Sequence, residues 1–293
     1  MKSTREGYGQ GLLKLGKKKN VYALSADLTE STQTHHFAKK YPQHFIQCGV
    51  AEQNMVSMAC GLALENKIPF ASTFGVFMIR AMDQIRISVC YNNLNVKLVA
   101  THCGLMTGED GTTHQALEDV AMLRALPNLT IIEPCDYDQA LEATLEIAKH
   151  QGPVYFRLHR GKSLPVKTPK FKIGQGQVIK KGKKLTVVCS GPVINQVLKA
   201  IEKLDYVPEI INMPTIKPLD VKLLKKSYQK TGKVLVVQDH HVIGGLGSAV
   251  QEVLSNVTVF GVEDTFTESG LPQELWDKYG LSVKRILNFM RKV

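Results

Sequence analysis

The sequence has no long hydrophobic run and very little tryptophan. No stretch of about 18 consecutive apolar residues occurs, which is the length that a membrane-spanning helix requires, and Trp276 is the single tryptophan. The first twenty residues have no apolar core of the kind found in secretion signals, and they already include an acidic residue. The sequence therefore predicts a cytoplasmic protein that does not bind a membrane.

Closely spaced cysteines are missing as well. The six cysteines are scattered without a C-x-x-C pair, at Cys48, Cys60, Cys90, Cys103, Cys135 and Cys189. In a chain of 293 residues this spacing predicts reduced thiols in a cytosolic protein, and neither a disulfide framework nor a zinc site.

Acidic residues are fewer than basic ones, and the formal net charge is +11. The lysine runs Lys17–Lys19 and Lys180–Lys184 lie near expected turns. They lack the interleaved aromatic residues of a nucleic-acid-binding face, so no nucleic-acid partner is expected. A phosphorylated small substrate or an acidic partner fits the charge equally well.

The chain instead contains a regular alternation of strand and helix patterns. In the first half, strands are expected at 20–27, 44–49, 68–73, 95–102, 128–134 and 153–158, and helices at 7–18, 31–41, 52–64, 76–91, 115–127 and 136–150. In the second half, strands are expected at 184–190, 206–212, 233–239 and 256–262, and helices at 193–204, 219–230 and 248–255. This pattern predicts an α/β fold with two open, mainly parallel sheets flanked by helices.

The alternation of strands and helices is interrupted once, by a segment rich in proline, glycine and lysine. We therefore expect a first domain at 1–163, a linker with a short hairpin at 164–184 and a smaller Rossmann-like domain at 185–293.

Polar residues follow the strands of the first domain, where open parallel sheets bind ligands. One such position is Glu52, in the first turn of an otherwise apolar helical pattern. The helix dipole alone is a sufficient reason for an acid there. Another is the loop from His102 to His114, which holds two acids and three glycines. It suits a hydroxyl-bearing ligand and proton transfer better than a metal, because the histidines lack zinc-site spacing.

Other patterns are weaker. Phe74 and Phe77 are three residues apart after a strand, and such pairs more often belong to a core than to a cofactor site. The glycine-rich stretch Gly244–Gly247 lacks the G-x-G-x-x-G spacing of a dinucleotide site.

Several motifs nevertheless occur together, in the order and spacing of one family. They are GYGQGLLKLG, ALSADLT, GVAEQNM, STFGVFMIRAMDQIR, THCGLMTGEDGTTHQALEDVAMLRALPN and TIKPLD. In these motifs the chain resembles the carboxyl-terminal portion of transketolase, a thiamine-diphosphate enzyme. The resemblance implies a pyrimidine-binding domain followed by a transketolase C-terminal domain.

The resemblance implies cofactor-binding roles for four residues. Glu52 would hydrogen-bond N1′ of the aminopyrimidine ring and thereby activate the cofactor, and Phe74 and Phe77 would pack on that ring. Asp27 would belong to the network beside the cofactor. Arg80 stands where some members of the family carry a third aromatic residue.

Substrate-binding roles follow from the same resemblance. His102, Asp110 and His114 match positions that contact sugar hydroxyls, and the two histidines join Glu52 as catalytic residues. Ser31 and Arg160 match positions near the substrate phosphate, with Arg157 as a weaker candidate. The implied reaction moves a two-carbon ketol unit from a ketose phosphate to an aldose phosphate, as in the pentose phosphate pathway.

Complete transketolases also have an amino-terminal domain whose Gly-Asp-Gly motif and later asparagine bind the diphosphate and its metal. The sequence Gly108–Gly111 reads GEDG, but it lies in the substrate loop and no suitably spaced asparagine follows it. The resemblance thus implies a split enzyme. Its second subunit would be the amino-terminal, diphosphate-binding transketolase chain, which would hold Mg²⁺ (or Ca²⁺), with no metal ligand in this chain. A homodimer of this chain within a heterotetramer is expected.

Two alternatives stay open. The first is a subunit similar to 1-deoxyxylulose-5-phosphate synthase or to the beta chain of 2-oxoacid dehydrogenases. The THC and TTHQ sequences around the loop favour transketolase over both. The donor substrate distinguishes these enzymes, because it is either pyruvate or a ketose phosphate. The second is a non-catalytic regulatory paralogue, against which an intact Glu52 argues.

Overall fold

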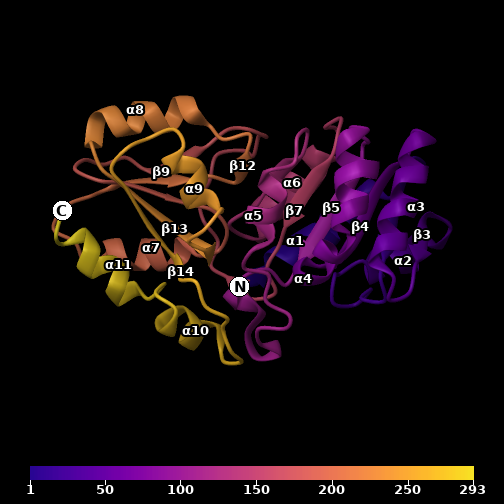
Figure 1. The fold of residues 1–293 in the computed structure, drawn as a ribbon, viewed down its shortest axis with the longest axis horizontal. Coiled ribbons are helices and arrows are strands. Elements are labelled where there is room, and N and C mark those ends of the chain that lie inside the picture. Colours follow the sequence, from indigo (N-terminus) through magenta and orange to yellow (C-terminus); the bar gives the residue numbers. More distant parts are fainter.

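The computed structural model describes residues 1–293 and contains two α/β units that lie side by side (Figure 1). Each unit has an open, mainly parallel sheet with helices packed against it. The expected fold class is confirmed. No helix combines the length and the apolar composition needed to cross a bilayer.

The sheet of the first unit has seven strands in the order β12-β6-β7-β5-β4-β2-β3. Their bounds are β2 Val21–Ser25, β3 Phe45–Gln47, β4 Ile68–Phe74, β5 Lys97–Thr101, β6 Thr130–Ile132, β7 Val154–Arg157 and β12 Thr215–Lys217. Only β12 runs antiparallel to its neighbour. Every residue of β4 and β5 is buried, as expected for central parallel strands covered on both faces.

Six α-helices accompany this sheet: α1 Thr4–Leu15, α2 His35–Lys40, α3 Glu52–Leu64, α4 Gly75–Met78, α5 Asp119–Arg124 and α6 Tyr137–Ile147. A capping box between Ser3 and Glu6 starts α1. The single helix expected at 76–91 is divided into α4, a 3-10 turn at Ile79–Ala81 and a π-helix at Gln84–Tyr91. The division places Arg80 in the short turn, next to the start of α3.

The sheet of the second unit has five strands in the order β14-β13-β10-β11-β9. Its elements are β9 Gln177–Lys180, β10 Thr186–Cys189, β11 Glu209–Asn212, β13 Val234–His241 and β14 Val257–Val262, with α7 Ile194–Ile201, α8 Val221–Thr231, α9 Leu246–Gln251, α10 Pro272–Lys278 and α11 Val283–Met290. Part of the segment expected as a linker, 164–184, forms β9, which pairs antiparallel with β11 instead of forming a hairpin of its own.

The two units share packing as well as a chain connection. Strand β12 follows β11 in the sequence but pairs with β6 of the first sheet. The largest apolar cluster includes Leu98 of β5 together with Val188 of β10 and Ile211 of β11. A short ribbon also pairs β1 Lys2–Ser3 with β8 Lys162–Ser163. The boundary between the units is therefore a packed core, which fixes the position of loops that cross it.

Candidate active site

The predicted site residues follow the carboxyl ends of neighbouring parallel strands. Asp27 follows β2, Phe74 ends β4, His102 follows β5, and Arg160 lies three residues beyond β7. Glu52 begins α3 after the loop that leaves β3. Because these strands are parallel, their ends meet at one edge of the sheet, which we call the rim.

Glu52 is nearly buried at this rim. Its side chain is 6% exposed, and its Oε1 lies 3.3 Å from Nη1 of Arg80, whose side chain is 56% exposed. This is the one hydrogen bond that its carboxylate makes to another side chain. The carboxylate thus faces the rim with capacity for a further polar partner.

Four planar side chains form a column beside Glu52. The ring centroids of His102 and Phe74 are 3.7 Å apart, and those of Phe74 and Phe77 are 5.4 Å apart with nearly parallel planes. The guanidinium of Arg80 lies over Phe77 at 4.5 Å from the ring centroid. Phe74 is buried, whereas Phe77 is only partly so. Neither phenylalanine belongs to one of the three apolar core clusters, which is consistent with a place at the rim.

His102 is held neutral by its surroundings. Burial, the guanidiniums of Arg5 and Arg160, and His114 lower its pKa to about 2. Nη1 of Arg5 lies 3.3 Å from Nε2 of His102, and Thr101 Oγ1 lies 3.0 Å from Nδ1. Since a guanidinium only donates, Nε2 accepts, and we infer that Nδ1–H donates to Thr101.

Two of the predicted site residues have left-handed backbones. Asp27 has a φ of 59° and His102 a φ of 57°, a conformation that is uncommon for residues other than glycine and recurs at functional sites. The N–H of Asp27 donates to Oε1 of Gln47 at 2.8 Å. Asp27 itself is exposed.

The loop from His102 to His114 folds back over the rim. Nη1 of Arg160 lies 3.0 Å from Oδ2 of Asp110 and also donates to the carbonyl of Thr107 at 2.9 Å. The His114 ring packs edge-on against Phe77, with centroids 5.4 Å apart. The structure therefore brings His102, Asp110, His114 and Arg160 together around the exposed edge of the column.

The second unit supports this loop. The carboxylate of Asp239 in β13 accepts from the N–H of Leu105 at 2.9 Å and from Nε1 of Trp276 at 3.1 Å. Gly104, which precedes Leu105, has a φ of 72°, and a Cβ there would lie 2.6 Å from the Asp239 carboxylate. A glycine is required at this position, and the C-terminal unit determines where the loop begins.

Arg5 is a site residue that the sequence reasoning missed. It lies in the first turn of α1, where it contacts His102 and donates to the carbonyl of Ser31 at 2.8 Å. Burial and the nearby Arg160 lower its pKa. No signal in the sequence pointed to it, because the helix was expected to begin at residue 7 and Arg5 precedes that pattern.

Arg157 is not available to a substrate phosphate, and this weaker candidate is wrong. Its side chain is 1% exposed, and its Nε lies 2.9 Å from Oδ2 of Asp119. It also donates to Glu133 and, at 3.1 Å, to the carbonyl of Asp239. Arg157 therefore belongs to the boundary between the units.

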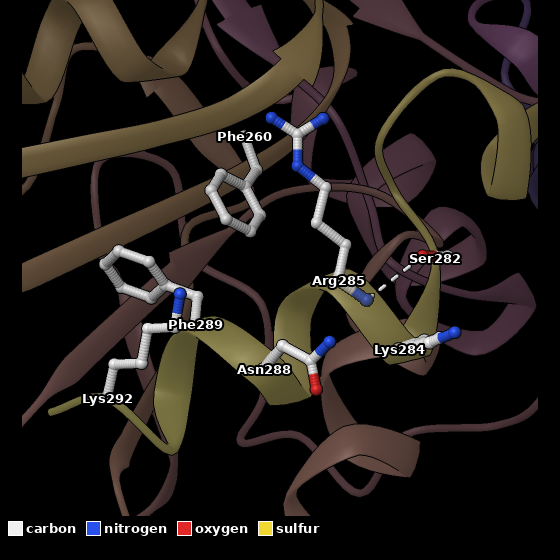
Figure 2. A pocket seen from close by; sticks show the side chains of 7 residues that line it. All are labelled: Phe260, Ser282, Lys284, Arg285, Asn288, Phe289 and Lys292. Atoms are coloured by element: carbon white, nitrogen blue, oxygen red, sulfur yellow. Dashed lines mark hydrogen bonds between the residues drawn. The ribbon is translucent and has the colours of Figure 1, made fainter.

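A separate hollow of about 520 Å³ lies on the second unit, between β14 and α11 (Figure 2). It is lined by Phe260, Phe289 and three cationic side chains, those of Lys284, Arg285 and Lys292. Arg285 lies over Phe260 at 4.7 Å from the ring centroid and pairs with Glu263 at 3.6 Å. None of the rim residues lines it. No group of three or more histidine, cysteine or acidic side chains is placed to hold a metal ion.

Comparison with known proteins gives the family. The model of the transketolase pyrimidine-binding domain matches residues 1–164, and that of the transketolase C-terminal domain matches residues 174–286. A putative transketolase C-terminal section of Methanocaldococcus jannaschii is 43% identical, over 99% of this chain and 97% of that protein. A 6-deoxy-6-sulfo-D-fructose transketolase subunit of Clostridium sp. is 36% identical, over 99% and 94% of the two chains.

Among solved structures, a split-gene transketolase described as an inactive β4 tetramer is 42% identical and superposes with a TM-score of 0.92, covering 100% of this chain and 98% of that one. The sequence motifs, the fold and these matches agree. The chain belongs to the transketolase family and corresponds to its C-terminal section, a pyrimidine-binding domain followed by a transketolase C-terminal domain.

Proposed function

We propose that this chain is the pyrimidine-binding subunit of a split, cytoplasmic transketolase that transfers a two-carbon ketol unit between sugar phosphates. It would be active only with a second subunit that carries the diphosphate- and metal-binding domain. The observation that carries the proposal is a nearly buried glutamate beside an aromatic ring at the rim, adjacent to a cluster of histidines and arginines.

The residues at the rim fit the pyrimidine part of thiamine diphosphate. Glu52 provides a nearly buried carboxylate with one replaceable partner, and Phe77 provides a partly exposed ring for stacking. When bound, the cofactor supplies a carbon nucleophile and an electron sink, which side chains lack. Glu52 would share a proton with the ring nitrogen N1′. Asp27, exposed at the next strand end, would join the polar network around the cofactor.

The substrate end would be formed by charged and imidazole side chains. Arg5 and Arg160 flank His102, and with the Ser31 hydroxyl they would bind the phosphate of the sugar. Guanidiniums suit this task because they can donate two parallel hydrogen bonds to an oxyanion.

Proton transfer would fall to the histidines. His102 is neutral, so that it can donate a hydrogen bond from one ring nitrogen and accept on the other. His114 and Asp110, on the other side of the loop, would hold the hydroxyl groups at the reacting carbons.

The helix that begins at Glu52 suggests where the partners dock. Its solvent-facing residues carry no charge along the whole of α3, and they are Gln53, Asn54, Ser57, Met58, Gly61 and Leu64. Leu64 is 68% exposed. An uncharged, partly apolar helix face is typical of a protein interface. It would be covered by the diphosphate-binding subunit and a second copy of this chain, in a heterotetramer.

The related split-gene transketolase described as an inactive β4 tetramer supports the need for the second subunit. Sedimentation tests the assembly. The two chains mixed together should sediment as a complex of about two copies of each, and a stable monomer of this chain in the mixture would overturn this part of the proposal.

A second candidate substrate comes from the clostridial relative, a sulfofructose transketolase subunit. A sulfonate is also an oxyanion, and Arg5 and Arg160 would bind it by the same hydrogen bonds. The ketol-transfer chemistry and the residues involved would be unchanged.

The experiment measures ketol transfer from xylulose 5-phosphate to ribose 5-phosphate, with thiamine diphosphate and Mg²⁺. This chain is assayed alone and mixed with a chain that carries the Gly-Asp-Gly domain, and 6-deoxy-6-sulfofructose and pyruvate serve as alternative donors. We expect activity only when the two chains are mixed, and none from this chain by itself. Activity with pyruvate alone would overturn the transketolase proposal in favour of a synthase-like or 2-oxoacid dehydrogenase-like reaction.

Glu52→Gln in the mixed complex should reduce kcat by about 10²–10⁴-fold, because the amide cannot share a proton in the same way. Glu202→Gln, at the exposed end of α7 in the second unit, is the matched control and should retain full activity. Retained activity in the Glu52 variant would leave the regulatory alternative standing.

A further inference from the structure

Arg80 makes two contacts that a pyrimidine ring would also make. Its Nη1 lies 3.3 Å from Oε1 of Glu52, and its planar guanidinium covers the Phe77 ring at 4.5 Å. A flat, nitrogen-containing ring that stacked on Phe77 and hydrogen-bonded to Glu52 would need the same place.

We propose that Arg80 is a placeholder in the pyrimidine site, a side chain that occupies the site until the cofactor displaces it. The inference rests on the proposed function, since it assumes that Glu52 and Phe77 receive the pyrimidine ring. It adds a competitor within the chain that the cofactor must remove in order to bind.

The burial of Glu52 explains why a placeholder is useful. Burial removes part of the water around the Glu52 carboxylate, so a partner at the open side of the site stabilises it, although modestly because that partner is itself half-exposed. The Arg80 guanidinium compensates the Glu52 charge while the pyrimidine site is empty. Since the Arg80 side chain is 56% exposed, it returns to water without opening the core.

The backbone around Arg80 allows the side chain to move alone. Nε2 of Gln53 donates to the carbonyl of Arg80 at 3.2 Å, which fixes the short turn Ile79–Ala81 against α3. The guanidinium makes no hydrogen bond other than the one to Glu52. Release of that bond and of the stacking on Phe77 therefore requires only rotation of the side chain.

The proposal predicts that loss of Arg80 tightens cofactor binding. A half-exposed ion pair and an exposed cation–π contact are each weak, so Arg80→Leu should lower the Kd for thiamine diphosphate by about three- to tenfold. Arg80→Lys keeps the charge without the flat guanidinium and should fall between the wild type and the leucine variant. Arg86→Leu, an exposed arginine two turns further on, is the matched control and should leave the Kd unchanged.

The experiment is calorimetric titration of thiamine diphosphate, with Mg²⁺, into the complex of this chain with its diphosphate-binding partner. It measures binding and not turnover. Tighter binding by the Arg80→Leu complex is the expected result. Unchanged or weaker binding, with a normal wild-type titration, would overturn the placeholder while leaving the proposed function intact. Absence of binding in every complex, wild type included, would overturn the proposed function, and the placeholder with it.

Discussion

Two arginines of the first domain each bind a glutamate, in opposite surroundings. Arg157 is 1% exposed and donates to the side chains of Asp119 and Glu133 and to two backbone carbonyls. Arg80 is 56% exposed and donates to Glu52 alone. A guanidinium and a carboxylate thus form a permanent contact at the domain boundary and a replaceable contact at the rim.

The difference follows from the alternatives open to each group. When a fully buried guanidinium leaves its partners, two carboxylates remain in a low-dielectric interior without compensation, and this is strongly destabilising. When Arg80 leaves, water or a ligand can take its place. Burial, more than the identity of the ion pair, determines whether such a contact can be exchanged for a ligand.

Of the changes considered, Arg157→Leu should destabilise the protein most. The variant leaves Asp119 and Glu133 buried and unpaired, and we expect the free energy of unfolding to fall by about 3–5 kcal/mol. Urea denaturation with linear extrapolation measures the change. Arg86→Leu at the surface serves as the control and should be within about 0.5 kcal/mol of the wild type. A loss below about 1 kcal/mol for Arg157→Leu would show that the buried pairs are not essential.

Acid should destabilise the boundary. Burial alone would raise the pKa of Glu133, but the Arg157 guanidinium and the hydrogen bonds from His159 and Ser190 hold it below its usual value. A depressed folded-state pKa gives stability that is present above the unfolded value of about 4.3 and is lost as pH falls further.

His240 makes the stability depend on pH in a higher range than Glu133 does, because burial lowers the pKa of His240 to about 4. The unfolded chain binds this proton near pH 6.5, so the contribution of His240 to stability should be lost as pH drops from about 6.5 to about 4, and below that the loss from Glu133 continues the fall. Thermal midpoints measured from pH 7.5 to 3.5 test both steps. His240→Gln should reduce the slope of the upper part without removing it, because buried His102 contributes there too, and an upper slope unchanged in the variant would contradict the assignment to His240.

Trp276→Phe should weaken the link between the domain boundary and the rim. The change removes the Nε1–H that donates to Asp239, and about 1–1.5 kcal/mol of stability should be lost with it. Because Asp239 also anchors the loop at Leu105, KM for the ketose phosphate should rise more than kcat falls. An unchanged KM with reduced stability would limit the C-terminal domain to a structural role.

The residues of the site that lie in local motifs could be predicted from the sequence. Four of the predicted residues lie at or just after the end of a predicted strand, and parallel topology brings such ends together; they are Glu52, Phe74, Phe77 and His102. His114 ends the loop that follows His102. The structure places these five residues at one rim. Their chemical roles remain predictions.

Contacts between distant segments were not predictable in the same way. Arg5 contacts His102 from 97 residues away, and β12 leaves its own domain to pair with β6. Arg157 is next to the predicted rim in sequence, but Asp119 and Glu133 turn it into the interior. No local pattern distinguishes an arginine that will be buried from one that will stay exposed, because the partners that decide it are long-range neighbours.

Arg80→Leu should have the smallest effect on stability. Since its guanidinium is half-exposed, the loss of its bond to Glu52 and of its contact with Phe77 should change the free energy of unfolding by less than about 1 kcal/mol. Urea denaturation of this chain alone measures it beside Arg157→Leu. A loss of 3 kcal/mol or more, on the scale of a broken buried pair, would make Arg80 a permanent contact like Arg157. A small change means that Arg80 can leave Glu52 at little cost, as an exchangeable partner must.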